Sequence, residues 1–164
     1  MNASSRSKII AEKSIQKLFR RLRRAGKKIV FTNGTFDLIH TGHVEYLEAA
    51  RSAGDLLVVG VNSDRSVKSY KDPSRPLNPL RDRMRVLAAL GCVDFVTPFD
   101  TPTPLALILK VRPHVLAKGA DWKKSQIVGA REVESWGGKV RRIRLVPGRS
   151  TTRLVNLLGG KGKS

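Results

Sequence analysis

IVFTNGTFDLIHTGH, residues 29–43, is a short apolar run followed by a loop with two glycines and the start of a helix. The β-branched and aromatic side chains of Ile29–Thr32 favour a strand. Residues 42–53 then have a helical pattern, which ends at Gly54. Leu56–Val61 follows as a continuous apolar run, typical of a strand buried on both faces. Strand, loop, helix and strand in this order predict one unit of an α/β fold.

The same alternation extends in both directions from this unit. Residues 9–24 have apolar side chains at helical spacing, and residues 64–77 are polar and irregular. We predict further strands at Asp94–Thr97, Val115–Lys118 and Val140–Val146, and further helices at 79–90, 103–111, 126–136 and 151–158. The predicted fold class is α/β: a Rossmann-like parallel sheet of five strands, in the order 3-2-1-4-5, with helices on both faces.

Length and composition indicate one domain. The chain has 164 residues, of which 40% are hydrophobic, so it can form a core of its own. We expect a flexible N-terminus at 1–8, a single domain at 9–158 that includes a basic N-terminal helix, and a flexible tail at 159–164. The lone cysteine, Cys92, excludes an intrachain disulfide. No membrane-spanning run or signal peptide is visible, so we expect a cytoplasmic protein.

The formal net charge of +19 is concentrated at the two ends of the chain. Residues 1–28 contain ten basic and one acidic side chain, and residues 139–164 contain eight basic and none that is acidic. Such ends bind nucleic acid, an anionic membrane or nothing in particular. Aromatic residues make up only 5% of the chain and no base-reading motif is present. A nucleic-acid-binding module is therefore the alternative from a different functional class.

Two histidines flank the start of the first helix of this unit. Parallel sheets bind ligands at the carboxyl ends of their strands, which places the loops 34–41 and 118–124 at the predicted site. His40 and His43 lie there with a helix N-terminus, and both features favour phosphate. A surface pair or two metal ligands are the alternatives, although only His114 and Cys92 remain as further soft ligands. The fingerprint GxGxxG is absent after the first strand, which argues against a dehydrogenase.

The motif HTGH at 40–43 resembles the HxGH signature of the nucleotidyltransferase superfamily that includes the cytidylyltransferases. Gly148–Thr152 resembles the RTEGISTT-type motif of the same superfamily. Four further segments are similar to the D-glycero-β-D-manno-heptose 1-phosphate adenylyltransferases: 61–64, 71–76, 78–84 and 118–122. The resemblance as a whole covers residues 10–158. The chain departs from that family's usual residues at Thr35, Asp72 and Ala120.

This resemblance implies transfer of AMP from ATP to D-glycero-β-D-manno-heptose 1-phosphate, giving ADP-heptose and pyrophosphate. ADP-heptose is a nucleotide-sugar precursor for the lipopolysaccharide core or related glycans. It also implies Mg²⁺ held mainly through the ATP phosphates, a homodimer, and a separate heptose kinase that supplies the sugar phosphate. The alternative within the enzyme class is a cytidylyltransferase or flavin adenylyltransferase that acts on another phosphorylated alcohol.

The resemblance also assigns roles to residues, and it predicts no protein ligand to a metal. The predicted catalytic residues are His40, His43 and Lys71. The predicted nucleotide-binding residues are Asn33, Gly34, Thr35, Phe36, Asp37, Gly42, Lys118, Gly119, Asp121, Trp122, Ser150, Thr151 and Thr152. The predicted sugar-phosphate-binding residues are Asn62, Asp64, Arg75 and Arg83, of which Arg83 has a solvated helix residue as its alternative interpretation.

Overall fold

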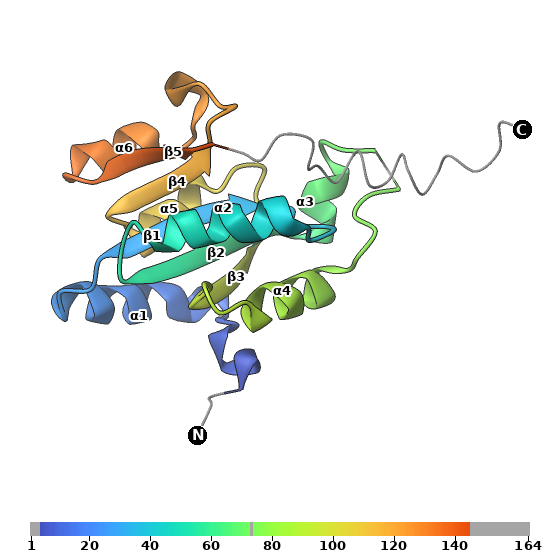
Figure 1. Ribbon diagram of the computed structural model, residues 1–164, viewed down its shortest axis with the longest axis horizontal. Coiled ribbons are helices and arrows are strands. Elements are labelled where there is room, and N and C mark those ends of the chain that lie inside the picture. Colours follow the sequence, from blue (N-terminus) through green and yellow to red (C-terminus); the bar gives the residue numbers. More distant parts are fainter. Residues whose placement is uncertain (1–3, 73, 145–164) are drawn as a thin grey trace, which may run out of the picture.

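A five-stranded parallel sheet forms the centre of the computed structural model, which describes residues 4–72 and 74–144 (Figure 1). Its strand order is β3-β2-β1-β4-β5, as predicted, and every pairing is parallel. The strands are β1 (Ile29–Gly34), β2 (Leu56–Asn62), β3 (Phe95–Phe99), β4 (Val115–Gly119) and β5 (Lys139–Ile143). The order changes direction between β1 and β4, so the crevice for a ligand opens beyond those two strands.

Helices cover both faces of the sheet because its strands are apolar on both sides. The α-helices are α1 (Glu12–Arg24), α2 (Thr41–Arg51), α3 (Asp64–Lys68), α4 (Leu80–Ala89), α5 (Leu105–Val111) and α6 (Ala130–Ser135), and the 3₁₀ helices are η1 (Ser5–Lys8) and η2 (Lys124–Gln126). Side chains of α2 and α4 pack in one core with Val30 and Val59. Side chains of α1, α5 and α6 pack in the other core with Phe31 and Val58. Neighbouring residues of each strand thus point to opposite cores.

The segment before α1 is ordered where we expected flexibility. Residues 5–8 form the 3₁₀ helix η1, and Lys8 Nζ donates hydrogen bonds to Leu90 O at 3.1 Å and Val93 O at 2.7 Å. Ile9 forms a bridge with Val96 of the edge strand β3. These contacts with α4 and β3 fix the segment, and its own sequence does not reveal them because they are long-range.

Two regions differ in detail from their prediction: 64–77, predicted to be irregular, and 126–136, predicted to be one helix. The segment 64–77 contains the short helix α3, which Ser63 caps by accepting a hydrogen bond from Ser66 N at 3.0 Å. The predicted helix at 126–136 is divided into η2 and α6 by Gly129, whose φ of 86° is left-handed. The predicted last helix, at 151–158, lies outside the described residues.

Candidate nucleotide-binding site

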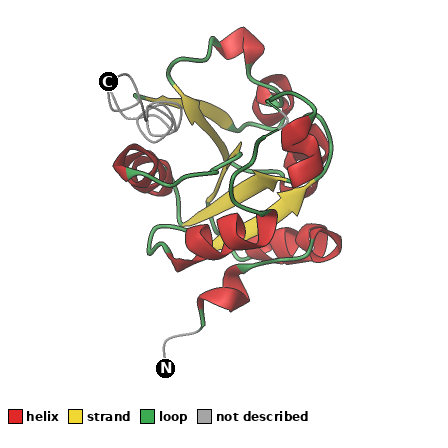
Figure 2. Ribbon diagram, turned by 90° about the vertical axis from the view of Figure 1, so that its right-hand side faces the viewer, coloured by secondary structure: helices red, strands yellow, loops and turns green. Residues whose placement is uncertain are grey.

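A cavity of about 630 Å³ lies at the carboxyl ends of the strands, on the side that faces the viewer in Figure 2. It is lined by every described residue that we predicted to bind nucleotide or to act in catalysis, and by two of the four predicted for the sugar phosphate. These residues are Asn33, Gly34, Thr35, Phe36, Asp37, His40, Gly42, His43, Asn62, Lys71, Arg75, Lys118, Gly119, Asp121 and Trp122. Segments that are distant in the sequence therefore meet in one place.

The rings of His40 and His43 stack inside this cavity. Their centroids are 3.9 Å apart and their planes differ by 28°. Burial, the neighbouring His40 and Lys71 together lower the pKa of His43 to about 4. His43 is consequently a neutral imidazole at pH 7. Its Nδ1 is buried and finds no hydrogen-bond partner among the described residues, so a proton on Nε2 avoids leaving a buried donor unpaired.

The ring of Phe36 packs against His43, one of these two histidines. Its ring lies 5.3 Å from that of His43, at an interplanar angle of 60°. The backbone of Phe36 has a φ of 48°, a conformation that non-glycine residues rarely adopt. Gly34 leaves room for the ring, because a Cβ there would approach Phe36 to 3.0 Å. The glycine that ends β1 thus permits the turn that places Phe36 under His43.

The N-terminus of α2 points its first amides at the same cavity. His40 occupies the N-cap position in an extended conformation, and no described side chain caps the helix. The first N–H groups of a helix have no partner within the helix, and its dipole favours negative charge there. Gly42, in this first turn, lines the cavity. The site therefore combines backbone donors with two imidazoles, which suits a phosphate.

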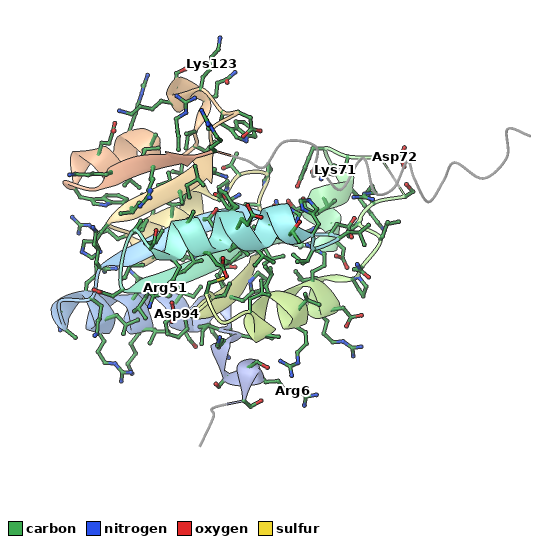
Figure 3. The ribbon with its side chains drawn as sticks, viewed as in Figure 1. Arg6, Arg51, Lys71, Asp72, Asp94 and Lys123 are labelled. Carbon is green, nitrogen blue, oxygen red and sulfur yellow. The ribbon has the colours of Figure 1, made fainter. Side chains whose placement is uncertain are left out.

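Three basic side chains complete the lining. Lys118 Nζ donates a hydrogen bond to Asn33 Oδ1 at 2.6 Å, and burial lowers the pKa of this lysine to about 8, against an opposing effect of Asp121. Burial, followed by the nearby Arg75, also lowers the pKa of Lys71. Lys71 stands on the loop after α3, as Figure 3 shows. A polyanion would offset the mutual repulsion and the desolvation of these cations.

Asp37 holds the loop that carries Arg75. Its carboxylate lies 3.0 Å from the Arg75 guanidinium and accepts hydrogen bonds from Leu77 N and Asn78 N, each at 2.9 Å. Asn78 Nδ2 in turn donates to the Asp37 carbonyl oxygen at 2.7 Å. The Asp37 side chain is 2% exposed and fully engaged within the protein. Although Asp37 lines the cavity, its chemistry is therefore that of a loop anchor.

Asp64 and Arg83 are not among the residues that line the cavity. Arg83 is 1% exposed, and it donates to the carbonyl oxygens of Asn78, Thr35 and Asn62 and to Asp64 Oδ1. This burial contradicts the interpretation of Arg83 as a solvated helix residue, whereas its contact with the sugar phosphate stays a prediction. A guanidinium can satisfy several acceptors that converge in the interior, which explains why an arginine is buried here.

Some predicted residues could not be located, and some lining residues were not predicted. Ser150, Thr151 and Thr152 lie outside the described residues. Tyr46, Tyr70, Thr103 and Gln126 line the cavity without having been predicted. Tyr70 is 52% exposed, and its hydroxyl lies 2.8 Å from Thr35 Oγ1. An aromatic next to Lys71 was a signal for Tyr70, whereas residues 103 and 126 reach the site only through the fold.

The described part of the chain has neither a cluster of side chains for a metal ion nor a helix that could span a membrane. No three His, Cys, Asp or Glu side chains gather there in a way that could hold a metal ion. None of the described helices has both the length and the apolar character required to span a bilayer.

Comparison with known proteins agrees with this geometry. Residues 31–155 match the family model described as cytidylyltransferase-like, which covers the paired histidines, strands β2 to β5 and all but the first two residues of β1. The chain belongs to the cytidylyltransferase-like family. This cytidylyltransferase-like domain is a nucleotidyltransferase.

Similar curated proteins carry the name "Bifunctional protein HldE". The one from Methylobacillus flagellatus is 58% identical over 136 residues, which are 83% of this chain and 28% of that protein. The one from Syntrophotalea carbinolica is 52% identical over 149 residues, which are 91% of this chain and 30% of that protein. The cytidylyltransferase-like domain thus spans less than a third of the length of these relatives.

A solved structure has the same fold. It is described as the lipopolysaccharide core biosynthesis protein from Thermoplasma volcanium GSS1. It matches with a TM-score of 0.61 at 24% identity and covers 74% of this chain and 98% of that one. At this identity the likeness supports the Rossmann-like fold alone.

Proposed function

We propose that the protein transfers AMP from ATP to D-glycero-β-D-manno-heptose 1-phosphate, which yields ADP-heptose and pyrophosphate. The observation that carries this proposal is the cavity itself. Stacked imidazoles, the N-terminus of α2 and the side chains of Lys71, Arg75 and Lys118 converge on a space of about 630 Å³. Relatives named HldE at 50–58% identity, and the resemblance of segments 71–76 and 118–122, favour the heptose substrate.

The reaction is a direct displacement at phosphorus. An oxygen of the sugar 1-phosphate attacks the α-phosphorus of ATP, and the bond from that phosphorus to the oxygen bridging to the β-phosphorus breaks. Pyrophosphate leaves with the electron pair. No covalent intermediate on the enzyme is needed, so the protein contributes by positioning the two substrates and stabilising charge.

The two histidines stabilise the charge that develops at the α-phosphate. As a neutral imidazole, His43 donates one hydrogen bond to a phosphate oxygen and brings no full charge of its own. His40 stacks on it and stands at the helix N-terminus, where backbone N–H groups donate to the same phosphates. Donors that are fixed before the reaction cost no reorganisation in the transition state.

The remaining side chains divide between nucleotide and acceptor. Lys71 and Lys118 neutralise phosphate charge, and Asp121 and Trp122 border the ribose and base. Arg75 and Asn62 bind the phosphate of the sugar. Asp37 holds the arginine in place through their ion pair of 3.0 Å. Ser150, Thr151 and Thr152 are proposed to bind the β- and γ-phosphates, as the family motif implies.

Mg²⁺ fits this site only as a partner of the substrate. Asp121 is the lining carboxylate that no described ion pair or hydrogen bond engages, and one carboxylate suffices for an ion that keeps most of its waters. Bound to ATP, the ion would neutralise phosphate charge. We further propose a cytoplasmic homodimer. The acceptor must be supplied by a phosphorylation that creates the sugar 1-phosphate.

A substrate panel tests the proposed reaction. The protein is incubated with ATP or CTP and with heptose 1-phosphate, glycerol 3-phosphate or flavin mononucleotide, and pyrophosphate release is followed. We expect turnover with ATP and heptose 1-phosphate to exceed every other pair by at least about 10²-fold, a separation typical of a site that is built for one acceptor. Turnover with CTP and glycerol 3-phosphate, and none with ATP and heptose 1-phosphate, would reject the proposal in favour of a cytidylyltransferase.

A further inference from the structure

Arg83 is a buried cation that lies just outside the cavity and connects the segments around it. Its side chain is fully buried, although arginine almost never is unless it is paired. The guanidinium belongs to α4, yet only one of its four acceptors, Asn78 O at 2.9 Å, lies beside that helix in the sequence. The other three come from segments 19 to 48 residues away.

These three acceptors lie at the carboxyl ends of the neighbouring strands β1 and β2. Arg83 Nη1 donates to Thr35 O at 2.6 Å, in the loop that leads into Phe36 and the paired histidines. Arg83 Nη2 donates to Asn62 O at 2.8 Å and Asp64 Oδ1 at 2.6 Å, at the end of β2. One planar group therefore ties the loop after β1 to the end of β2 and the start of α3, just beyond the paired residues Gly34 and Val61.

Asp64 makes this junction more rigid. Its second carboxylate oxygen accepts from Leu80 N at 3.2 Å, at the first residue of α4. Asp64 thus bridges the guanidinium and the helix that carries it. A lysine has a single ammonium on a flexible chain and cannot hold four acceptors in one plane, so the arrangement requires a guanidinium.

We propose that Arg83 is a positioning residue that holds the nucleotide side of the cavity in register with the acceptor side. The nucleotide side comprises residues 34–43, and the acceptor side comprises Asn62 and residues 74–78. This inference rests on the proposed function for its kinetic consequence. Without the guanidinium, each substrate still meets its own side chains, but the attacking oxygen and the α-phosphorus are no longer aligned. Misplacement by about 1 Å can cost about 10²-fold in rate.

The test compares Arg83→Lys with Arg81→Lys, a matched change on the same helix. Arg81 is 91% exposed, and within the described part of the chain it forms an ion pair with its neighbour Asp82. For Arg83→Lys we expect a kcat that is about 30- to 100-fold lower, with the KM for ATP within about threefold and a stoichiometry of ATP binding equal to that of the wild type. Arg81→Lys should match the wild type in all three. A purely structural role would lower the number of ATP-binding molecules instead.

A second measurement does not depend on which reaction is catalysed. Amide hydrogen exchange of Arg83→Lys should show joint loss of protection in peptides that cover 34–40 and 61–66, with helix α5 unchanged. Unchanged protection in either loop, a wild-type kcat, or a loss of kcat explained by fewer ATP-binding molecules would overturn the inference. If the wild type fails on heptose 1-phosphate in the substrate panel, the proposed function fails, and the exchange experiment still decides the role of Arg83.

Discussion

At the scale of single residues, the site contains ionisable groups whose pKa values the fold lowers, among them His43 and Lys118. Burial, together with the neighbouring His40 and Lys71, holds the pKa of His43 near 4. In an unfolded chain a histidine titrates near 6.5. As the pH falls from about 6.5 towards 4, the unfolded state takes up a proton that the folded state refuses, so the folded state loses stability in that window.

This linkage predicts a specific effect of His43→Gln. Between pH 7 and pH 4.5 the melting temperature of the wild type should fall more than that of the variant, because the variant has no imidazole to protonate at this position. Thermal unfolding at both pH values measures the difference, and comparison within each protein cancels the contributions of other groups. Equal losses in both proteins would mean that His43 is not held neutral.

Replacing Lys118 should make the protein more stable and weaken its use of ATP. Burial lowers its pKa to about 8, so the unfolded state binds this proton more readily, and the penalty is fully present at pH 7. Lys118→Met should therefore raise the melting temperature at pH 7, by about 2–4 °C for each kcal/mol relieved. It should also raise the KM for ATP, because the cation beside Asn33 is lost. A variant that is both less stable and fully active would contradict this role.

Gly34 and Gly91 form a matched pair. A Cβ at Gly34 would meet the Phe36 ring at 3.0 Å, whereas a Cβ at Gly91 would have no atom within 4 Å. We expect Gly34→Ala to displace Phe36 from under His43 and to lower kcat by about tenfold or more. Gly91→Ala should leave kcat unchanged. Steady-state kinetics of the two variants decides, and equal kcat values would remove Phe36 from the support of the histidine.

At the scale of elements, the sequence predicted the strands well and the short helices poorly. Strands β1 to β4 each contain a short apolar run that can be recognised without knowing its partners, whereas β5 has basic residues between Val140 and Ile143. The order β3-β2-β1-β4-β5 followed from the alternation and the resemblance. In contrast, η1 depends on hydrogen bonds from Lys8 to the carbonyl oxygens of Leu90 and Val93, between α4 and β3, that only the fold provides. A pattern confined to one segment cannot report such contacts.

The division between η2 and α6 shows the same limit. A glycine inside a helical pattern is usually tolerated at a small cost. Gly129 instead adopts a φ of 86°, and a Cβ there would come within 2.6 Å of Ile108 Cδ1 in α5. The packing of α6 against α5 therefore requires a residue without a side chain, which the helical spacing of 126–136 does not indicate.

Gly129 and Gly137 separate backbone strain from this steric effect. Both have a left-handed φ, of 86° and 84°, but a Cβ at Gly137 has no atom within 4 Å. Gly137→Ala should lower the free energy of unfolding by about 1 kcal/mol, the cost of the backbone conformation. Gly129→Ala should lower it by about 1–3 kcal/mol more, because Ile108 must move. Urea unfolding measures both, and equal losses would contradict the close packing.

At the scale of the whole molecule, the site lies at one edge and the basic side chains of α1 lie elsewhere. The outer face of α1 exposes a row of basic side chains, whereas its inner face buries Ile15 and Phe19 in the core. The residues in this row are Lys13, Lys17, Arg20, Arg21 and Arg24. None of them lines the cavity. These five basic side chains of α1 lie outside the site, and no described ion pair engages them.

The candidate site was predictable where its residues form a local motif. The loop after β1 and the N-terminus of α2 carry six of the predicted lining residues within one continuous stretch, and they lie together as expected. The burial of Arg83 was not predicted because it depends on acceptors from the loop after β1, from β2 and from α3. Side chains of a helix cannot be assigned to solvent or to the interior until the packing partners are known.

The central claim is that this cavity transfers an adenylyl group to a sugar phosphate, with the imidazoles stabilising the charge. The most direct measurement follows the label from ATP labelled at the α-phosphorus, with heptose 1-phosphate as acceptor, in the wild type and in His43→Ala. We predict that the label appears in ADP-heptose in equal amount to the pyrophosphate released, at a kcat about 10²–10³-fold lower in the variant. Label that stays in ATP, or undiminished transfer by a folded His43→Ala, would contradict the account.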